Sequence, residues 1–172
     1  RISPYLRDAQ RVEAVATISN YMASIVDYRG FNDVEGWRHA VAHSADVMLQ
    51  LALNKALSPA HIHQLLDALQ SQISPEEHFY HYGEPKRLAI AFIYLVFREG
   101  ISLGNIKERL EEIAAPAPLK QWSDAYKSNS GLAHMHNNRA FLLELSVLSS
   151  NREQEKLVAI NEQVRALLRN TQ

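Results

Sequence analysis

Two histidines and an aspartate stand at the spacing of metal ligands in the segment G-W-R-H-A-V-A-H-S-A-D. His39, His43 and Asp46 occupy positions i, i+4 and i+7, so a helix through this segment would place all three side chains on one face. Imidazole nitrogens and a carboxylate can bind a divalent metal ion and leave positions open for water or substrate. In H-E-x-x-H metalloproteases a glutamate general base follows the first histidine, and here that position is Ala40. The sequence therefore disfavours a metalloprotease mechanism.

The same residues also have a structural interpretation, which we favour. A histidine on a buried helix face can donate one hydrogen bond to a backbone carbonyl and accept another from a hydroxyl, and His43 can bond to Asp46 within its own helix. Structural networks produce such clusters as readily as functional sites do. Trp37, directly ahead of the histidines, is more often a packing anchor than a platform for a ligand.

A second polar cluster follows at intervals of three residues, with His78, His81, Glu84 and Arg87 where the chain passes from a loop into a helix. Glu84 and Arg87 share a helix face, and we expect them to form a surface ion pair. The two histidines would join the first cluster only if their loop folds over its helix. The other histidines are expected to be polar residues on the surface or between helices: His61, His63, His134 and His136.

The composition excludes several classes of protein. The 172 residues include 18 basic and 19 acidic side chains and no cysteine, which excludes a disulfide scaffold, a thiolate zinc finger and a cysteine nucleophile. The chain has no stripe of basic residues of the kind that would indicate nucleic-acid binding. The longest apolar run, residues 88–97, is too short to span a membrane. Motifs of serine hydrolases, P-loop enzymes and dinucleotide-binding proteins are absent.

Helical periodicity runs through almost the whole chain, and breaks with recognisable cap residues divide it. Residues 27–36 contain two glycines and predict a loop, and no segment alternates as a strand would, so we expect no sheet. The expected helices cover residues 4–26, 37–54, 58–70, 84–100, 102 or 104 to 115, 119–127, 132–148 and 151 to the end.

The spacing of the helix pairs predicts the architecture. Comparable helices begin near Trp37, Pro85 and Leu132, about 47 residues apart, which is the length of HEAT-type two-helix repeats. We therefore expect a single all-α domain over residues 1–172, built of antiparallel helical hairpins stacked as a HEAT-like α-α superhelix. A compact orthogonal bundle is the alternative.

The two polar segments resemble a known bacterial family. D-Y-R-G-F-N-D-V-E-G-W-R-H-A-V-A-H-S-A-D at residues 27–46 and G-E-P-K-R-L-A at residues 83–89 are similar to motifs of the domain of unknown function 2785. Family members are typically longer at the N-terminus, so the resemblance implies that this chain is the C-terminal part of a longer protein. It implies no activity, but it marks the residues that match the motifs: Asp27, Arg29, Gly30, Gly36, Trp37, His39, His43, Asp46, Glu84 and Arg87.

Two functional hypotheses follow. We favour a non-enzymatic module that binds a protein or a small molecule, without a cofactor, through residues Asp27, Arg29, Trp37, His39, His43, Asp46, Glu84 and Arg87. In the alternative, a metal-assisted or acid-base enzyme, His39 and His43 hold a divalent metal ion or move a proton while Asp46 orients one imidazole. Arg29 and Arg87 would then receive an anionic group of the substrate. Absence of cysteine fits the cytoplasm and the periplasm alike, and we expect the cytoplasm.

Overall fold

The computed structural model describes residues 6–170, which form seven α-helices, one short 3-10 helix and a two-stranded antiparallel sheet. In chain order these elements are α1 (Asp8–Ala23), β1 (Phe31–Asn32), β2 (Gly36–Trp37), α2 (Ala40–Ala52), α3 (Pro59–Gln70), α4 (Glu84–Val96), α5 (Leu103–Ala114), η1 (Trp122–Lys127), α6 (Asn129–Ser149) and α7 (Glu155–Asn170). The all-α class expected from the periodicity is confirmed.

Three α-helices begin after a serine whose side chain caps them. Ser58 accepts a hydrogen bond from the backbone of His61 and starts α3, and Ser102 starts α5 in the same way. Ser128 caps α6 by accepting from the backbone of Gly131, so that helix begins three residues earlier than expected. The last helix does not begin at residue 151 as expected, because Asn151 has a positive φ of 54° and α7 begins only at Glu155.

The expectation that the chain contains no sheet was wrong, and so was the start of the second helix. Residues 31–37 form a β-hairpin, closed by a turn in which the Asn32 side chain accepts from the backbone of Val34 and Glu35. Gly36 takes a positive φ of 71° there. The first helix begins at Asp8 and ends at Ala23, so it stops three residues before the expected end at residue 26, and the expected start at residue 4 lies outside the described residues.

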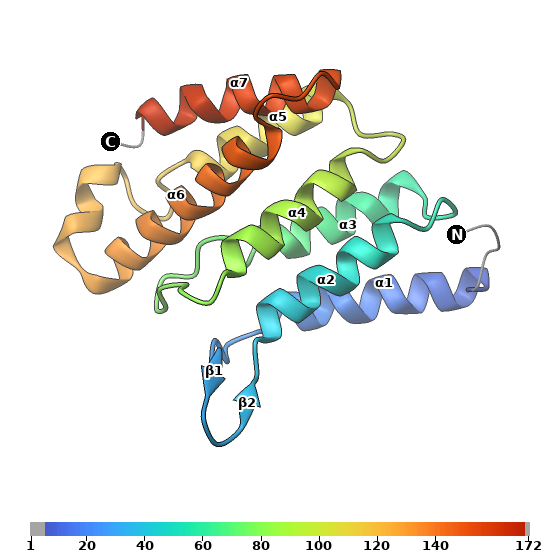
Figure 1. Ribbon diagram of the computed structural model, residues 1–172, viewed down its shortest axis with the longest axis horizontal. Coiled ribbons are helices and arrows are strands. Elements are labelled where there is room, and N and C mark those ends of the chain that lie inside the picture. The colour runs from blue at the N-terminus through green and yellow to red at the C-terminus, as the bar shows by residue number, and fades with distance from the viewer. Residues whose placement is uncertain (1–5, 171–172) are drawn as a thin grey trace.

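The helices form two layers (Figure 1). α2 packs on α4 and α4 packs on α6, so these three helices lie side by side, while α1 and α3 pack behind them. α7 covers α5 and α6. Stacked helical hairpins would produce this order of neighbouring helices. The HEAT-like superhelix itself stays a prediction. No helix of residues 6–170 combines the length and the apolar character that crossing a membrane requires.

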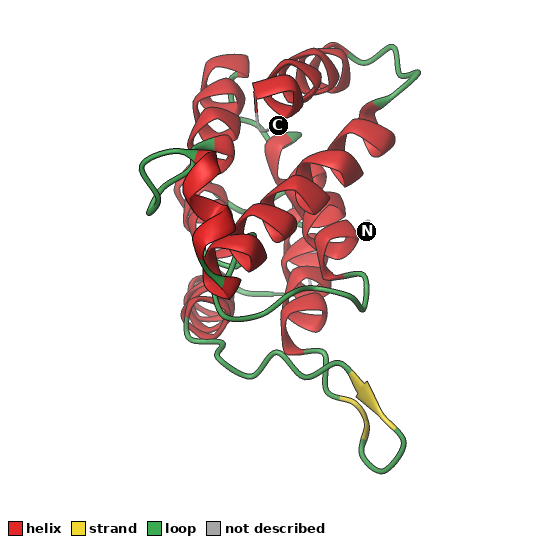
Figure 2. Cartoon of the chain, turned by 90° about the vertical axis from the view of Figure 1, so that its left-hand side faces the viewer, coloured by secondary structure: helices red, strands yellow, loops and turns green. Residues whose placement is uncertain are grey.

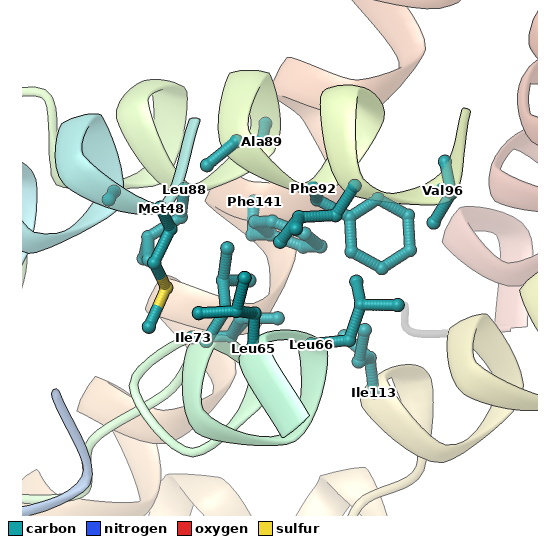
Figure 3. Packing of buried hydrophobic residues seen from close by; sticks show 14 of the residues in the cluster. Met48, Leu65, Leu66, Ile73, Leu88, Ala89, Phe92, Val96, Ile113 and Phe141 are labelled. Atoms are coloured by element: carbon teal, nitrogen blue, oxygen red, sulfur yellow. The ribbon is translucent and has the colours of Figure 1, made fainter. Parts of the chain in front are cut away.

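A shared hydrophobic core fixes this arrangement (Figure 3). Met48 of α2, Leu88 and Phe92 of α4, and Phe141 of α6 are buried together, and the rings of Phe92 and Phe141 meet edge to face at 5.8 Å. The packing aligns α2, α4 and α6 so that all three N-terminal ends lie at one end of the molecule. The β-hairpin projects from that same end (Figures 1 and 2).

Candidate functional site

Packing of α2 against α4 brings the two polar segments of the sequence into contact. His39 Nε2 lies 3.2 Å from Glu84 Oε1, and Arg87 Nη1 lies 3.2 Å from Asp46 Oδ1. Each contact joins one residue of the first segment to one of the second. The loop at residues 27–39, the N-terminal half of α2 and the start of α4 therefore form one candidate site.

His39 does not lie on the helical face that the sequence predicted. It precedes α2 as the N-cap residue with a positive φ of 41°, and its backbone N–H donates to Arg29 O at 2.9 Å. Its buried ring stacks on Trp37 with centroids 5.0 Å apart and meets the ring of His43 at 5.9 Å. The i, i+4, i+7 face was therefore wrong for His39, although the two imidazoles do come together.

Glu84 is a buried acid, with only 2% of its surface exposed. Its Oε2 accepts a hydrogen bond from the backbone of Tyr82 at 2.9 Å, while Oε1 faces His39. The His39 contact has the distance of an ion pair but not the direction of a hydrogen bond, so His39 Nε2 is buried beside the carboxylate without a hydrogen-bond partner. The expected surface pair of Glu84 with Arg87 was wrong, because Glu84 points inward and Arg87 reaches Asp46.

The loop at residues 71–83 folds over the hairpin and the start of α2, which was the condition for joining the two histidine clusters. The ring of Tyr82 meets Trp37 at 5.8 Å and His39 at 6.3 Å, and its hydroxyl donates to Phe31 O at 3.4 Å. His81 contacts Tyr82 in turn at 5.1 Å. Four histidines, at positions 39, 43, 78 and 81, thus lie in one chain of ring contacts.

Three aromatic rings near the hairpin face solvent and form what we call the aromatic surface: Phe31, Trp37 and Tyr82. Their exposed fractions are 44%, 56% and 39%, and the rings of Phe31 and Trp37 lie 5.3 Å apart. Trp37 packs on His39 with one face, as a packing anchor would, and more than half of the residue is exposed.

Asp27 and Arg29 pair with each other at the base of the hairpin. Arg29 Nη2 lies 2.6 Å from Asp27 Oδ2, and its Nη1 lies 3.3 Å from Glu35 Oε2. Hydrogen bonds from the side chain and backbone of Arg29 hold the pKa of the Asp27 carboxyl well below its usual range. Arg29 is thus already engaged by carboxylates of its own hairpin.

Buried polar residues that the sequence did not single out hold the loop at residues 71–83. Asn137 of α6 donates to Pro75 O at 3.1 Å and to His78 O at 2.6 Å, and accepts from the backbone of Tyr80 at 2.8 Å. The ring of His134, buried beside the loop, lies 3.0 Å from Ser74 O. Asn137 stands in the polar run H-M-H-N-N-R at residues 134–139, and no sequence signal distinguishes it from its polar neighbours.

Gln72 performs the same task on the other side of the loop. Its side chain donates to Met22 O at 2.9 Å and to Ile25 O at 3.3 Å, and accepts from the Tyr28 hydroxyl at 3.2 Å. The Tyr80 hydroxyl donates to Gln72 O at 2.8 Å, and burial raises the pKa of Tyr80 far above its usual value. The loop is therefore anchored to α1 as well as to α6.

In the alternative hypothesis His39, His43 and Asp46 hold a metal ion, and two of these residues take other partners. Asp46 lies against Arg87, and Glu84 is the carboxylate that approaches His39. Across residues 6–170 there is no group of three or more His, Asp or Glu side chains arranged to hold a metal ion.

Gly30 offers a direct test of the contact between the hairpin and the loop. A Cβ atom added there would lie 2.0 Å from Cδ2 of Tyr82, so Gly30→Ala must displace that ring. We expect urea unfolding to show a loss of about 2 kcal/mol, the usual cost of overpacking. Gly36→Ala meets no atom within 4 Å, and its positive φ should cost only about 1 kcal/mol. If both variants lost the same free energy of unfolding, the contact between Gly30 and Tyr82 would contribute nothing to stability.

Comparison with known proteins places the chain in a family. The model of the family described as "Protein of unknown function (DUF2785)" matches residues 1–147, which extends from before α1 to within α6. No curated protein and no solved structure matches the chain. Because the match covers most of the 172 residues and includes both polar segments that meet in the candidate site, the chain belongs to the DUF2785 family.

Proposed function

We propose that this chain is a non-enzymatic binding module whose aromatic surface docks a protein partner. One observation carries the proposal: Phe31, Trp37 and Tyr82 are contiguous, exposed and carried in part by a hairpin that projects from the helical body (Figure 2). Clustered exposed aromatic rings are uncommon on surfaces without a partner, and tryptophan and tyrosine are enriched among the residues that dominate binding energy.

The surface is held in place before any partner arrives. Trp37 rests on His39, whose imidazole faces the buried carboxylate of Glu84, and the Tyr82 ring lies against Gly30. A partner would therefore bind rings whose positions are already restricted. Such preorganisation lowers the entropic cost of binding.

Charged groups around the surface largely neutralise one another. Arg38 pairs with Glu35 on the hairpin, Arg29 pairs with Asp27 at its base, and Arg87 pairs with Asp46 between α2 and α4. This balance supports a partner segment with apolar or aromatic side chains at its centre and little net charge.

The alternative of a metal-assisted or acid-base enzyme has less support. It needs both His39 and His43 to reach a substrate, and His39 is buried between Trp37 and Glu84. The buried pair of His39 and Glu84 instead supports a positioning role for both residues beneath the aromatic surface.

Trp37→Ala is expected to weaken a partner's binding by about 30-fold, because removing a central aromatic contact typically costs about 2 kcal/mol. Partners captured by the wild-type chain would be purified and titrated calorimetrically against the wild-type chain and this variant. Tyr126→Ala is the matched control, since that tyrosine is also exposed but lies in η1, outside the aromatic surface. A purified partner with equal affinity for the wild-type chain and Trp37→Ala would contradict the proposal.

A further inference from the structure

We propose that a cleft beside the hairpin base binds an organic cation, that is, an alkylammonium or guanidinium group. The cleft has a volume of about 640 Å³ and lies between residues 26–29 and residues 71–78. None of Phe31, Trp37 and Tyr82 lines it, so this site is separate from the aromatic surface and does not depend on the function proposed there.

Two stacked rings form part of the cleft wall. The rings of Tyr28 and His78 lie 5.3 Å apart and are nearly parallel, at 13°. Burial and the neighbouring His81 lower the pKa of His78, so its imidazole is neutral at pH 7 and does not repel a cation. Its Nε2 atom is buried and has no hydrogen-bond partner. Electron-rich ring faces attract ammonium and guanidinium groups.

The charge of the lining is negative. Asp27, Glu76 and Glu77 contribute three carboxylates and Arg29 one guanidinium, which leaves an excess of two negative charges. Arg29 is already bound by Asp27 and Glu35, whereas no ion pair within residues 6–170 involves Glu76 or Glu77. Burial raises the pKa of Tyr28, and the nearby carboxylate of Glu77 raises it further. The charge of Glu77 therefore acts on one of the two rings in the cleft wall.

Both sides of the cleft are fixed by partly buried hydrogen bonds. Gln72 holds Tyr28 through its hydroxyl, and Asn137 and His134 hold the backbone of residues 74–78. The carboxylates and rings are thus presented on anchored backbone, which limits the ordering cost of binding. A fixed aromatic wall with surplus carboxylates is the chemistry that recognises an organic cation, either a free polyamine or a basic side chain of a peptide.

Isothermal titration calorimetry with two probes tests the site and separates the two sources. Spermidine represents the free polyamine, and an acetyl-Gly-Arg-Gly-amide peptide represents a basic side chain. We expect one of them to bind in 1:1 stoichiometry and to lose affinity at least about fivefold in Glu76→Gln/Glu77→Gln, because two attractive charges are removed. Affinity should also fall as salt is raised, because exposed charges are screened.

The control variant Glu99→Gln/Glu153→Gln makes the same change of charge at exposed positions that do not line the cleft, and should bind like the wild-type chain. The peptide with citrulline in place of arginine has no charge and should not bind. The proposal is overturned if neither probe binds at about 1 mM, or if Glu76→Gln/Glu77→Gln and the wild-type chain have equal affinity. Trp37→Ala should bind the cation normally, so failure here and failure of the aromatic surface can be distinguished.

Discussion

Replacing Glu84 by alanine is expected to lower the free energy of unfolding by about 3 kcal/mol. The substitution removes the acceptor of the partly buried Tyr82 backbone N–H and the carboxylate that faces the buried His39 Nε2 atom. Buried polar groups that lose their partners pay the full cost of desolvation. Glu84 also lies in the first turn of α4, where a negative charge is favourable. Urea unfolding followed by circular dichroism measures the loss.

Two further variants separate the charge of Glu84 from its hydrogen bond. Glu84→Gln keeps an oxygen that can accept from the Tyr82 backbone and removes only the charge, so we expect a smaller loss, about 1 kcal/mol. Glu108→Ala removes an exposed acid from α5 and should change stability by less than about 0.5 kcal/mol. A Glu84→Ala variant as stable as Glu108→Ala would refute the role of the buried carboxylate.

Asn137→Ala is the second substitution for which we expect a loss of about 3 kcal/mol. Asn137 has no exposed surface, and its side chain satisfies three backbone groups of the loop, those of Pro75, His78 and Tyr80. Alanine would leave those groups without partners and a small void beside them. Thermal or urea unfolding measures the global loss.

Hydrogen exchange gives this prediction a local readout. The Tyr80 amide should exchange slowly in the wild-type chain, because it donates to the Asn137 side chain, and much faster in Asn137→Ala. Asn170→Ala, at the exposed end of α7, is the control and should change neither stability nor exchange at Tyr80. Unchanged protection of Tyr80 in Asn137→Ala would mean that other contacts hold the loop.

The helices could be predicted because their signals are local. Apolar residues repeat with the helical period, and Ser58 and Ser102 cap the helices that follow them through bonds that span only three residues. The hairpin at residues 31–37 was missed because its strands have only two residues each and show no alternation. Its turn depends on the Asn32 side chain and on a glycine with positive φ, both compatible with an ordinary loop.

The candidate site could be predicted in its residues but not in its contacts. The two polar segments were identified from residue types and spacing, and the structure joins them through His39 with Glu84 and Asp46 with Arg87. The partners were assigned differently from the sequence, as Glu84 with Arg87 and His43 with Asp46. Neighbours along one helix are visible in a sequence, whereas neighbours across two packed helices are not.

The sequence by itself determined that this protein is helical, where α3, α4 and α5 begin, and which two segments carry its polar chemistry. Only the tertiary structure decided that Glu84 is buried, that Asn137 holds the loop, and that Phe31, Trp37 and Tyr82 form one exposed surface. The physical reason is the separation along the chain over which each kind of interaction acts. Periodicity and capping act within a few residues, but burial and partner choice depend on which helices pack together, and contacts such as that of Tyr80 with Asn137 join residues 57 apart in the chain.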